Sequence, residues 1–155
     1  MKTKIPITRC SLCYLVNKTN DADFPILRET DIVLQNELIT VSVAAFWPDE
    51  KEGYLIVIPN NHYPTIYDTP DYVIKEMIRV TKKMSQIVKA INNCGGITII
   101  QNNESAGGQN VNHIHIHIYP RYKDDDFYTK MAKKTFFLAS LETRHKYCLK
   151  AKSLL

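Results

Sequence analysis

The sequence predicts a fold of the α+β class, in which short strands precede and follow one long amphipathic helix. Histidine and isoleucine alternate strictly over residues 113–118, a pattern typical of a β-strand because successive side chains leave a strand on opposite faces. Apolar residues recur at spacings of three and four over residues 73–91, as in a helix that buries one face. The two periodicities occupy separate segments, so strands and helix both contribute to the predicted core.

The length and composition fit one globular domain. A chain of 155 residues can bury roughly 70% of its unfolded surface, and a hydrophobic content of 45% is ordinary. The start of the sequence lacks the apolar run of a signal peptide, and no stretch approaches the roughly 18 apolar residues of a membrane span. We therefore expect a soluble cytoplasmic protein without membrane contact.

The net charge of +4 is concentrated in the last part of the chain. Residues 121–155 carry nine Lys/Arg against four Asp/Glu, whereas the preceding residues carry eleven against twelve. A basic tail attracts anionic substrates or nucleic acid, but a solvated helix face gives the same pattern. No segment interleaves aromatic and basic residues as a dedicated nucleic-acid binder does, so we expect no nucleic-acid partner.

Five segments have the composition of strands, and a tight turn at Asn36 and Glu37 joins the first two into a hairpin. They are residues 31–35, 38–45, 53–59, 97–101 and 113–119. The third is a near-continuous apolar run ended by Pro59, as expected of a central strand. A hairpin and a central strand are thus predicted before the long helix.

The long helix is predicted over about residues 70–93, with Thr69 as its N-cap and Pro70 at its first helical position. Its stripe of methionine and isoleucine indicates core packing rather than a cofactor site. Apolar residues between positions 138 and 149 indicate a second helix near the C-terminus. That helix would cap the domain or pair with another subunit.

Cys10 and Cys13 form a CxxC pair near the N-terminus. Four cysteines in a chain expected to be cytoplasmic do not indicate a disulfide framework. A CxxC pair alone fits either half of a metal site or a redox pair. A redox pair normally lies at the head of a helix that follows a strand, and few residues precede Cys10, so the pattern favours a metal.

A polar loop that contains two glycines leads into the alternating histidines. Glycines let backbone N–H groups of residues 102–110 approach a ligand, and amide side chains donate without adding charge. Imidazole is neutral and nucleophilic near neutral pH. A cradle of donors beside a row of imidazoles therefore indicates phosphorus chemistry, although the loop alone could be a turn built from small residues.

Residues 107–118, Gly-Gly-Gln-Asn-Val-Asn-His-Ile-His-Ile-His-Ile, resemble the signature of the histidine triad (HIT) superfamily of nucleotide hydrolases and transferases. The resemblance extends back through His62 to the CxxC pair and forward to Arg121. It implies an antiparallel sheet of about five strands with one long helix, often in a homodimer. We expect a HIT domain over residues 1–122 and a C-terminal extension over residues 123–155.

The resemblance assigns different roles to the triad residues. In the family, the middle histidine attacks the α-phosphorus of a nucleotide and forms a covalent nucleotidyl intermediate that water hydrolyses; this role falls on His115. A backbone carbonyl fixes the tautomer of that ring in the family. His117 matches the position that hydrogen-bonds phosphate and assists the leaving group. Gln109 and Asn110 match positions that line the phosphate site, and Asn102 corresponds to a loop residue near it.

The resemblance also implies a structural zinc ion. Zinc-containing members use a CxxC pair, a histidine after the central strand and the first triad histidine, which here are Cys10, Cys13, His62 and His113. Two thiolates and two imidazoles make a closed tetrahedral site without an open position for substrate. In the alternative, the cysteines are free, His113 is bonded to a backbone group and His62 is incidental.

Phe46 departs from the family pattern. Ungapped counting back from His62 places it where many members carry an Asp or Asn for the ribose hydroxyls, and a phenyl ring cannot accept those hydrogen bonds. Phe46 or Trp47 could stack on a base, or pack beside Pro48. The sequence therefore does not predict how a ribose would be bound.

Together these patterns predict a zinc-stabilised HIT hydrolase that cleaves a nucleoside phosphoramidate or dinucleoside polyphosphate through nucleotidyl-His115. One alternative is a nucleotide-binding regulatory or interaction module with little turnover. Another makes the three histidines a catalytic metal site, although no carboxylate is adjacent to them.

Overall fold

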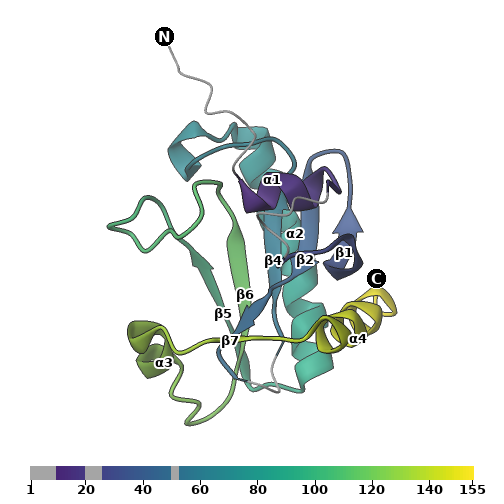
Figure 1. The fold of residues 1–155 in the computed structure, drawn as a ribbon, viewed down its shortest axis with the longest axis vertical. Coiled ribbons are helices and arrows are strands. Elements are labelled where there is room, and N and C mark those ends of the chain that lie inside the picture. The colour runs from purple at the N-terminus through teal and green to yellow at the C-terminus, as the bar shows by residue number, and fades with distance from the viewer. Residues whose placement is uncertain (1–9, 20–25, 50–52) are drawn as a thin grey trace.

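The computed structural model describes residues 10–19, 26–49 and 53–155. They form an α+β fold on a five-stranded antiparallel sheet with the strand order β1-β2-β4-β6-β5. The strands are β1 (Ile32–Gln35), β2 (Ile39–Val43), β4 (Leu55–Pro59), β5 (Gly96–Gln101) and β6 (Ile116–Arg121). Figure 1 shows the long helix α2 (Asp71–Asn92) behind this sheet. The predicted fold class and the five antiparallel strands are confirmed.

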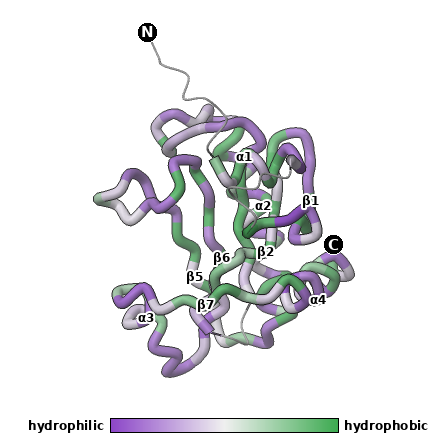
Figure 2. The backbone as a smooth tube through the Cα atoms, in the orientation of Figure 1, coloured by the Kyte–Doolittle hydropathy of each residue, from purple (hydrophilic) through white to green (hydrophobic). Residues whose placement is uncertain are grey.

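The core lies where α2 packs against β4 and β6. The apolar stripe of α2 is buried, as its spacing predicts. Ile114, Ile116 and Ile118 are between 0 and 4% exposed, so the isoleucines of the alternating segment point into the interior. Figure 2 shows hydrophobic segments along β2 and β5 and hydrophilic ones in the outer loops. His117, which lies within β6, consequently points to the other face of the sheet.

Helix α2 begins one residue later than predicted. Its N-cap is Pro70, which has an extended backbone and whose carbonyl oxygen accepts from the N–H of Val73 at 2.9 Å. The Thr69 hydroxyl instead donates to the carbonyl oxygen of Thr65 at 2.8 Å, across the short helical turn Ile66–Asp68. The prediction of Thr69 as N-cap is wrong, because its hydroxyl bonds back to the preceding turn and the helix begins after Pro70.

The strand that carries the histidines also begins later than predicted. Strand β6 starts at Ile116, and residues 113–115 lie outside the ladder. The N–H of Ile114 donates to the carbonyl oxygen of Tyr63 at 2.8 Å, which bonds this backbone to the loop after β4. The predicted strand is therefore wrong for its first three residues, because their backbone follows that loop instead of a neighbouring strand.

Residues after β6 form two helices and a short strand. Helices α3 (Phe127–Lys133) and α4 (Leu141–Lys152) lie on either side of β7 (Phe137–Leu138), as Figure 1 shows, and β7 pairs with β3 (Phe46–Trp47) in a separate two-stranded sheet. The predicted C-terminal helix is present but begins later, at Leu141, because Leu138 belongs to β7. The division of the chain at residue 122 stays a prediction. No helix among the described residues is long and apolar enough to cross a membrane.

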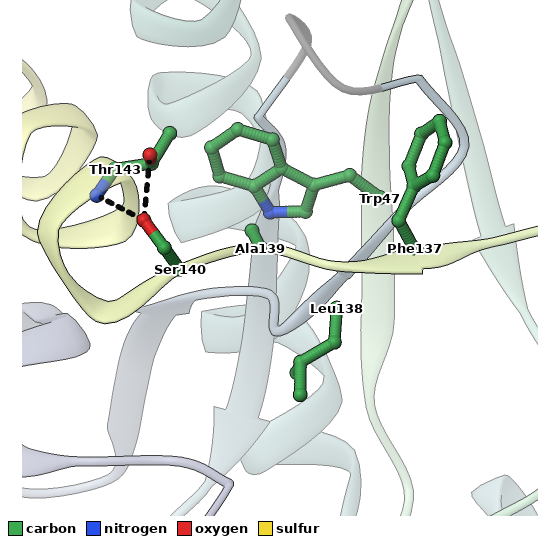
Figure 3. A pocket seen from close by; sticks show the side chains of 6 residues that line it. All are labelled: Trp47, Phe137, Leu138, Ala139, Ser140 and Thr143. Carbon is green, nitrogen blue, oxygen red and sulfur yellow. Dashed lines mark hydrogen bonds between the residues drawn. The ribbon is translucent and has the colours of Figure 1, made fainter.

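A hollow of about 220 Å³ lies beside β3, β7 and the start of α4 (Figure 3). It is lined by Trp47, Phe137, Leu138, Ala139, Ser140 and Thr143. The Ser140 hydroxyl caps α4 by accepting from the N–H of Thr143 at 3.1 Å. Trp47 is 2% exposed and donates its indole N–H to the carbonyl oxygen of Ala44, whereas Phe46 is 45% exposed. Trp47 therefore packs, and of the two aromatic residues considered for base stacking, Phe46 is the accessible one.

A buried ion pair joins α4 to the residue before β1. The side chains of Arg144 and Asp31 are 2% and 0% exposed, and 3.5 Å separates Nε from a carboxylate oxygen. The N–H of Arg28 donates to the other carboxylate oxygen at 2.9 Å. Burial raises the pKa of Asp31 and lowers that of Arg144, and each charge opposes the shift of its partner. Removing one side chain would leave the other charge buried without its counter-ion.

We expect Arg144→Leu to lower the free energy of unfolding by about 3 kcal/mol, because the carboxylate of Asp31 would lose its counter-ion in the interior. Equilibrium urea unfolding measures the change. The matched control is Lys146→Ala, which removes an exposed ion pair with Glu142 from the same helix and should cost little. Equal costs for the two variants would contradict a stabilising role of the buried pair.

Candidate metal centre and histidine site

Two cysteines and two histidines meet between α1 (Ser11–Val16), the end of β4 and the segment before β6. Cys10 is the N-cap of α1 and Cys13 lies in its first turn. His62 follows β4, and His113 precedes β6. One potential ligand atom from each of the four lies within 4.8 Å of the others. The structure thus brings together the four residues that the sequence assigned to one metal site.

The contacts within this Cys-His cluster have the lengths expected between ligands of one ion. Cys13 Sγ lies 3.2 Å from His62 Nδ1 and 3.4 Å from His113 Nδ1. Cys10 Sγ also lies 3.4 Å from His113 Nδ1. Tetrahedral bonds of about 2.0–2.3 Å place nitrogen and sulfur ligands roughly 3.5 Å apart. The four side chains could therefore hold a metal ion with little rearrangement.

The second nitrogen of His113 shows which tautomer the ring adopts. His113 Nε2 lies 3.0 Å from the carbonyl oxygen of Pro59. Because a carbonyl oxygen can only accept, Nε2 carries the proton and Nδ1 presents its lone pair to the two sulfur atoms. Metal binding through Nδ1 requires this tautomer. The backbone bond considered as an alternative to metal binding is present, and it prepares the ring for a metal.

The two thiols of the cluster differ in acidity. The hydrogen bond from Cys13 lowers the pKa of Cys10, with a further contribution from His113, and the same hydrogen bond raises the pKa of Cys13. Neither cysteine is in a disulfide. Both lie at the head of a helix, where redox pairs also occur, so helix position does not separate the two uses. The two imidazole nitrogens that face the sulfur atoms are what favours a metal.

His115 and His117 follow in the same chain segment; both are half-buried, and their ring centroids lie 4.6 Å apart. His115 Nδ1 lies 2.8 Å from the carbonyl oxygen of His113, so it carries the proton and leaves the lone pair on Nε2. Burial lowers the pKa of His115, and it lowers that of His117 to about 3. Both imidazoles are therefore neutral near neutral pH.

His117 has polar partners that the sequence analysis missed. Its Nδ1 lies 3.3 Å from the hydroxyl of Tyr119, and that hydroxyl donates to the hydroxyl of Tyr54 at 3.4 Å. Tyr119 follows His117 by two residues, so the alternation itself placed it on the same face. Tyr54 directly precedes β4 and reaches the site through the register that pairs Leu55 with Ile118, which no local pattern reveals.

The loop of residues 102–110, which extends from the sheet between β5 and β6 in Figure 1, is braced by its own side chains. Gln109 Nε2 donates to the carbonyl oxygen of Pro64 at 2.7 Å, and Gln109 Oε1 accepts from the N–H of Glu104 at 2.6 Å. Asn102 is half-buried, with Nδ2 3.5 Å from the carbonyl oxygen of Gly108, and Asn110 is exposed. Gln109 thus orders the loop, and phosphate binding by these residues stays a prediction.

Comparison with known proteins identifies the family to which this chain belongs. The family model of the HIT domain matches residues 28–124. The chain belongs to the HIT family. A HIT-like protein of Methanocaldococcus jannaschii is 36% identical over 48% of this chain and 57% of its own length. Adenylylsulfatase HINT3 of Arabidopsis thaliana is 30% identical over 61% and 53%, and adenosine 5'-monophosphoramidase HNT1 of Candida albicans is 30% identical over 48% and 51%. This HIT protein spans about half the length of these curated relatives.

Solved structures share the fold of this HIT protein at low sequence identity. A HIT-like protein of Bartonella henselae superposes with a TM-score of 0.76 at 18% identity, over 96% of this chain and 97% of the other. A Zn-bound histidine triad protein of Mycobacterium smegmatis gives 0.71 at 20% identity, over 95% and 93%. Diadenosine triphosphate hydrolase of Plasmodium falciparum gives 0.69 at 18% identity, over 82% and 77%. These similarities support the HIT fold.

The alternative of a three-histidine metal site gains no support from the geometry. Among the described residues, the group suited to a metal combines His113 with the two cysteines and His62. His115 and His117 turn their Nδ1 atoms to a carbonyl oxygen and a hydroxyl instead. The first triad histidine is thus separated in role from the other two.

We expect Gly107→Ala to loosen the loop of residues 102–110, because an added Cβ would lie far inside van der Waals contact of the Asn103 carbonyl oxygen. Amide hydrogen exchange should rise about tenfold at Gly107, Gly108 and Gln109, whose N–H groups now donate within the loop. Gly96→Ala is the matched control, because its Cβ would meet nothing within 4 Å. Unchanged exchange in Gly107→Ala would show that the loop tolerates the contact.

Proposed function

We propose that this HIT protein is a nucleotide hydrolase or transferase that acts at the α-phosphate of a nucleoside phosphoramidate or dinucleoside polyphosphate. His115 would form the covalent nucleotidyl intermediate. The hydrogen bond from His115 Nδ1 to the carbonyl oxygen of His113, 2.8 Å long, carries this proposal because it leaves the Nε2 lone pair available for attack. The names of two relatives, an adenylylsulfatase and an adenosine 5'-monophosphoramidase, and of the diadenosine triphosphate hydrolase support the substrate class.

The reaction would proceed in two displacements at phosphorus. In the first, the Nε2 lone pair of His115 forms a bond to the α-phosphorus, and the leaving group departs with the electron pair of its own bond and takes up a proton from solvent. In the second, water attacks, loses a proton, and the P–N electron pair returns to Nε2. The carbonyl oxygen of His113 accepts from Nδ1–H throughout and stabilises the positive charge on the substituted ring.

The remaining site residues complete the proposal. His117 lies beside His115 and would contact phosphate and assist the leaving group. Asn102, Gln109 and Asn110 would line the phosphate site through their amides and the loop backbone. Phe46 is accessible but replaces an expected ribose acceptor, so we propose that the α-phosphate, more than the ribose, determines binding.

We also propose that the Cys-His cluster holds one structural zinc ion. Cys10, Cys13 and His113 are each less than 10% exposed, which fits a closed tetrahedral site. The Zn-bound structural neighbour supports the choice of metal. Zinc would cross-link α1 to the segment before β6 and compensate the charge of the thiolates. His113 would meanwhile hold its carbonyl oxygen toward His115.

We further propose that the protein is a homodimer in the cytoplasm. Strand β5 is an edge of the five-stranded sheet, and Ile99 on it is 52% exposed, which suits a partner surface. Sedimentation of the purified protein tests this point. A monomer at all concentrations would refute the dimer.

We expect His115→Ala to reduce hydrolysis of adenosine phosphoramidate and diadenosine polyphosphates by about 10³-fold or more, because the nitrogen that forms the covalent intermediate is removed. Product formation and the mass of the nucleotidylated protein are measured together. His145→Ala, which removes an exposed histidine of α4, is the matched control and should keep full activity. Unchanged hydrolysis in His115→Ala would refute the nucleophile, and a wild type that binds nucleotide without turnover would establish the module instead.

Metal analysis of the purified protein should give about one zinc per chain. Cys13→Ser should lower this content and the thermal midpoint together, because metal binding contributes to folding free energy. Cys94→Ser is the matched control, since Cys94 is buried but lies outside the cluster. If the wild-type protein without metal had the same thermal midpoint as the protein with zinc, that result would be inconsistent with a structural zinc.

A further inference from the structure

The ring of His117 has one polar side chain bonded to it within the described residues. Its cross-strand neighbours on β4 and β5 are Ile56 and Ile100, which offer no donor or acceptor. Tyr119 stacks on the ring at a centroid distance of 5.4 Å and 11° between planes, and its hydroxyl lies 3.3 Å from Nδ1. The orientation of the Tyr119 hydroxyl therefore decides which nitrogen of His117 carries the proton.

The hydroxyl of Tyr54 determines that orientation. The Tyr119 hydroxyl donates to Tyr54 at 3.4 Å, and a hydroxyl has one proton and two lone pairs. With its proton directed to Tyr54, Tyr119 can only accept from His117, so Nδ1 carries the proton. Burial raises the pKa of Tyr119 to about 12 and raises that of Tyr54 well above its usual value. Both hydroxyls therefore keep their protons near neutral pH.

An acceptor at Nδ1 suits a ring that must take and give a proton. Neutral His117 then holds its lone pair on Nε2, and the imidazolium holds protons on both nitrogens. The bond from Nδ1–H to Tyr119 is the same in both states, so proton transfer at Nε2 needs no ring flip. A hydroxyl that donated to Nδ1 would instead oppose the protonated ring. The pair of tyrosines thus favours proton transfer at one defined atom.

We propose that Tyr119 is a positioning residue for His117, and that Tyr54 sets its direction by accepting the Tyr119 hydroxyl proton. This inference rests on the proposed function for its consequence. In the hydrolytic displacement, an O–H bond of the attacking water breaks, its electron pair stays on oxygen to attack phosphorus, and His117 Nε2 receives the proton. The protonated Nε2 then donates to a phosphate oxygen and afterwards releases the proton to solvent, which restores the neutral ring.

The experiment measures the tautomer of His117 directly. Long-range ¹H–¹⁵N correlation spectra of the labelled, metal-containing protein distinguish Nδ1–H from Nε2–H without any nucleotide present. We expect the wild type to show Nδ1–H at His117. In Tyr54→Phe, the Tyr119 hydroxyl is free to donate to Nδ1, so the Nε2–H form should become the major one. In Tyr119→Phe, loss of the acceptor should give a mixture of the two.

The kinetic counterpart uses the same variants with adenosine phosphoramidate. Both should lower kcat by about tenfold with KM within about twofold, since the change affects proton transfer and leaves the phosphate contacts in place. Tyr147→Phe is the matched control, because it removes another buried hydroxyl, one that accepts from Asn92 at 2.8 Å, and should leave the His117 spectrum and kcat unchanged.

Two results would overturn the inference: a wild-type His117 that is predominantly Nε2–H, or a Tyr54→Phe protein with the wild-type tautomer. If one variant does not fold, the wild-type spectrum and the spectrum of the other variant still test the tautomer of His117. A wild type with the expected tautomer but no turnover would reject the proposed reaction and keep the positioning of His117. Turnover with the opposite tautomer would reject the role of the tyrosines and keep the reaction.

Discussion

The site depends on the convergence of Cys10, Cys13, His62 and His113, because it fixes where the triad segment begins. The cluster joins α1 to the loop after β4 and to the residues before β6. His113 makes three contacts that hold the site together. Its Nδ1 faces the sulfur atoms, its Nε2 donates to the carbonyl oxygen of Pro59, and its own carbonyl oxygen accepts from His115. A change in the position of His113 would therefore alter both the Cys-His cluster and the hydrogen bond that orients His115.

Burial controls the protonation of the other site residues. It lowers the pKa values of His115 and His117, so the rings are neutral, and it raises those of Tyr54 and Tyr119, so the hydroxyls are protonated. The site consequently contains directional hydrogen bonds where a more solvated site would contain charges. Such bonds select tautomers, which is what proton transfer and nucleophilic attack at Nε2 require. The buried charged pair of Asp31 and Arg144 lies elsewhere, between α4 and the residue before β1.

Local periodicity predicted the long helix, the five strands of the main sheet and the burial of the isoleucines. The prediction was wrong where a polar group forms a hydrogen bond with a different segment than the local pattern indicates. The Thr69 hydroxyl bonds within the preceding turn instead of capping α2, and the N–H of Ile114 bonds to the loop after β4 instead of to a strand. Strands β3 and β7 contain two residues each, which is too short for alternation to be visible. These two strands form because they pair with each other, and neither segment alone has a sequence pattern that predicts the pairing.

The sequence by itself determined which side chains share a face, because alternation along an extended chain places residues 113, 115, 117 and 119 together. With the CxxC pair and the glycine-containing loop, it was also enough to indicate the HIT family. The tertiary structure decided which nitrogen of His113 and of His115 carries the proton, and that the ring of His62 reaches Cys13. It also decided that Tyr54 meets Tyr119. The physical reason is that the Pro59 carbonyl oxygen and the Tyr54 hydroxyl reach the site through the register that pairs β4 with β6, which no local pattern contains.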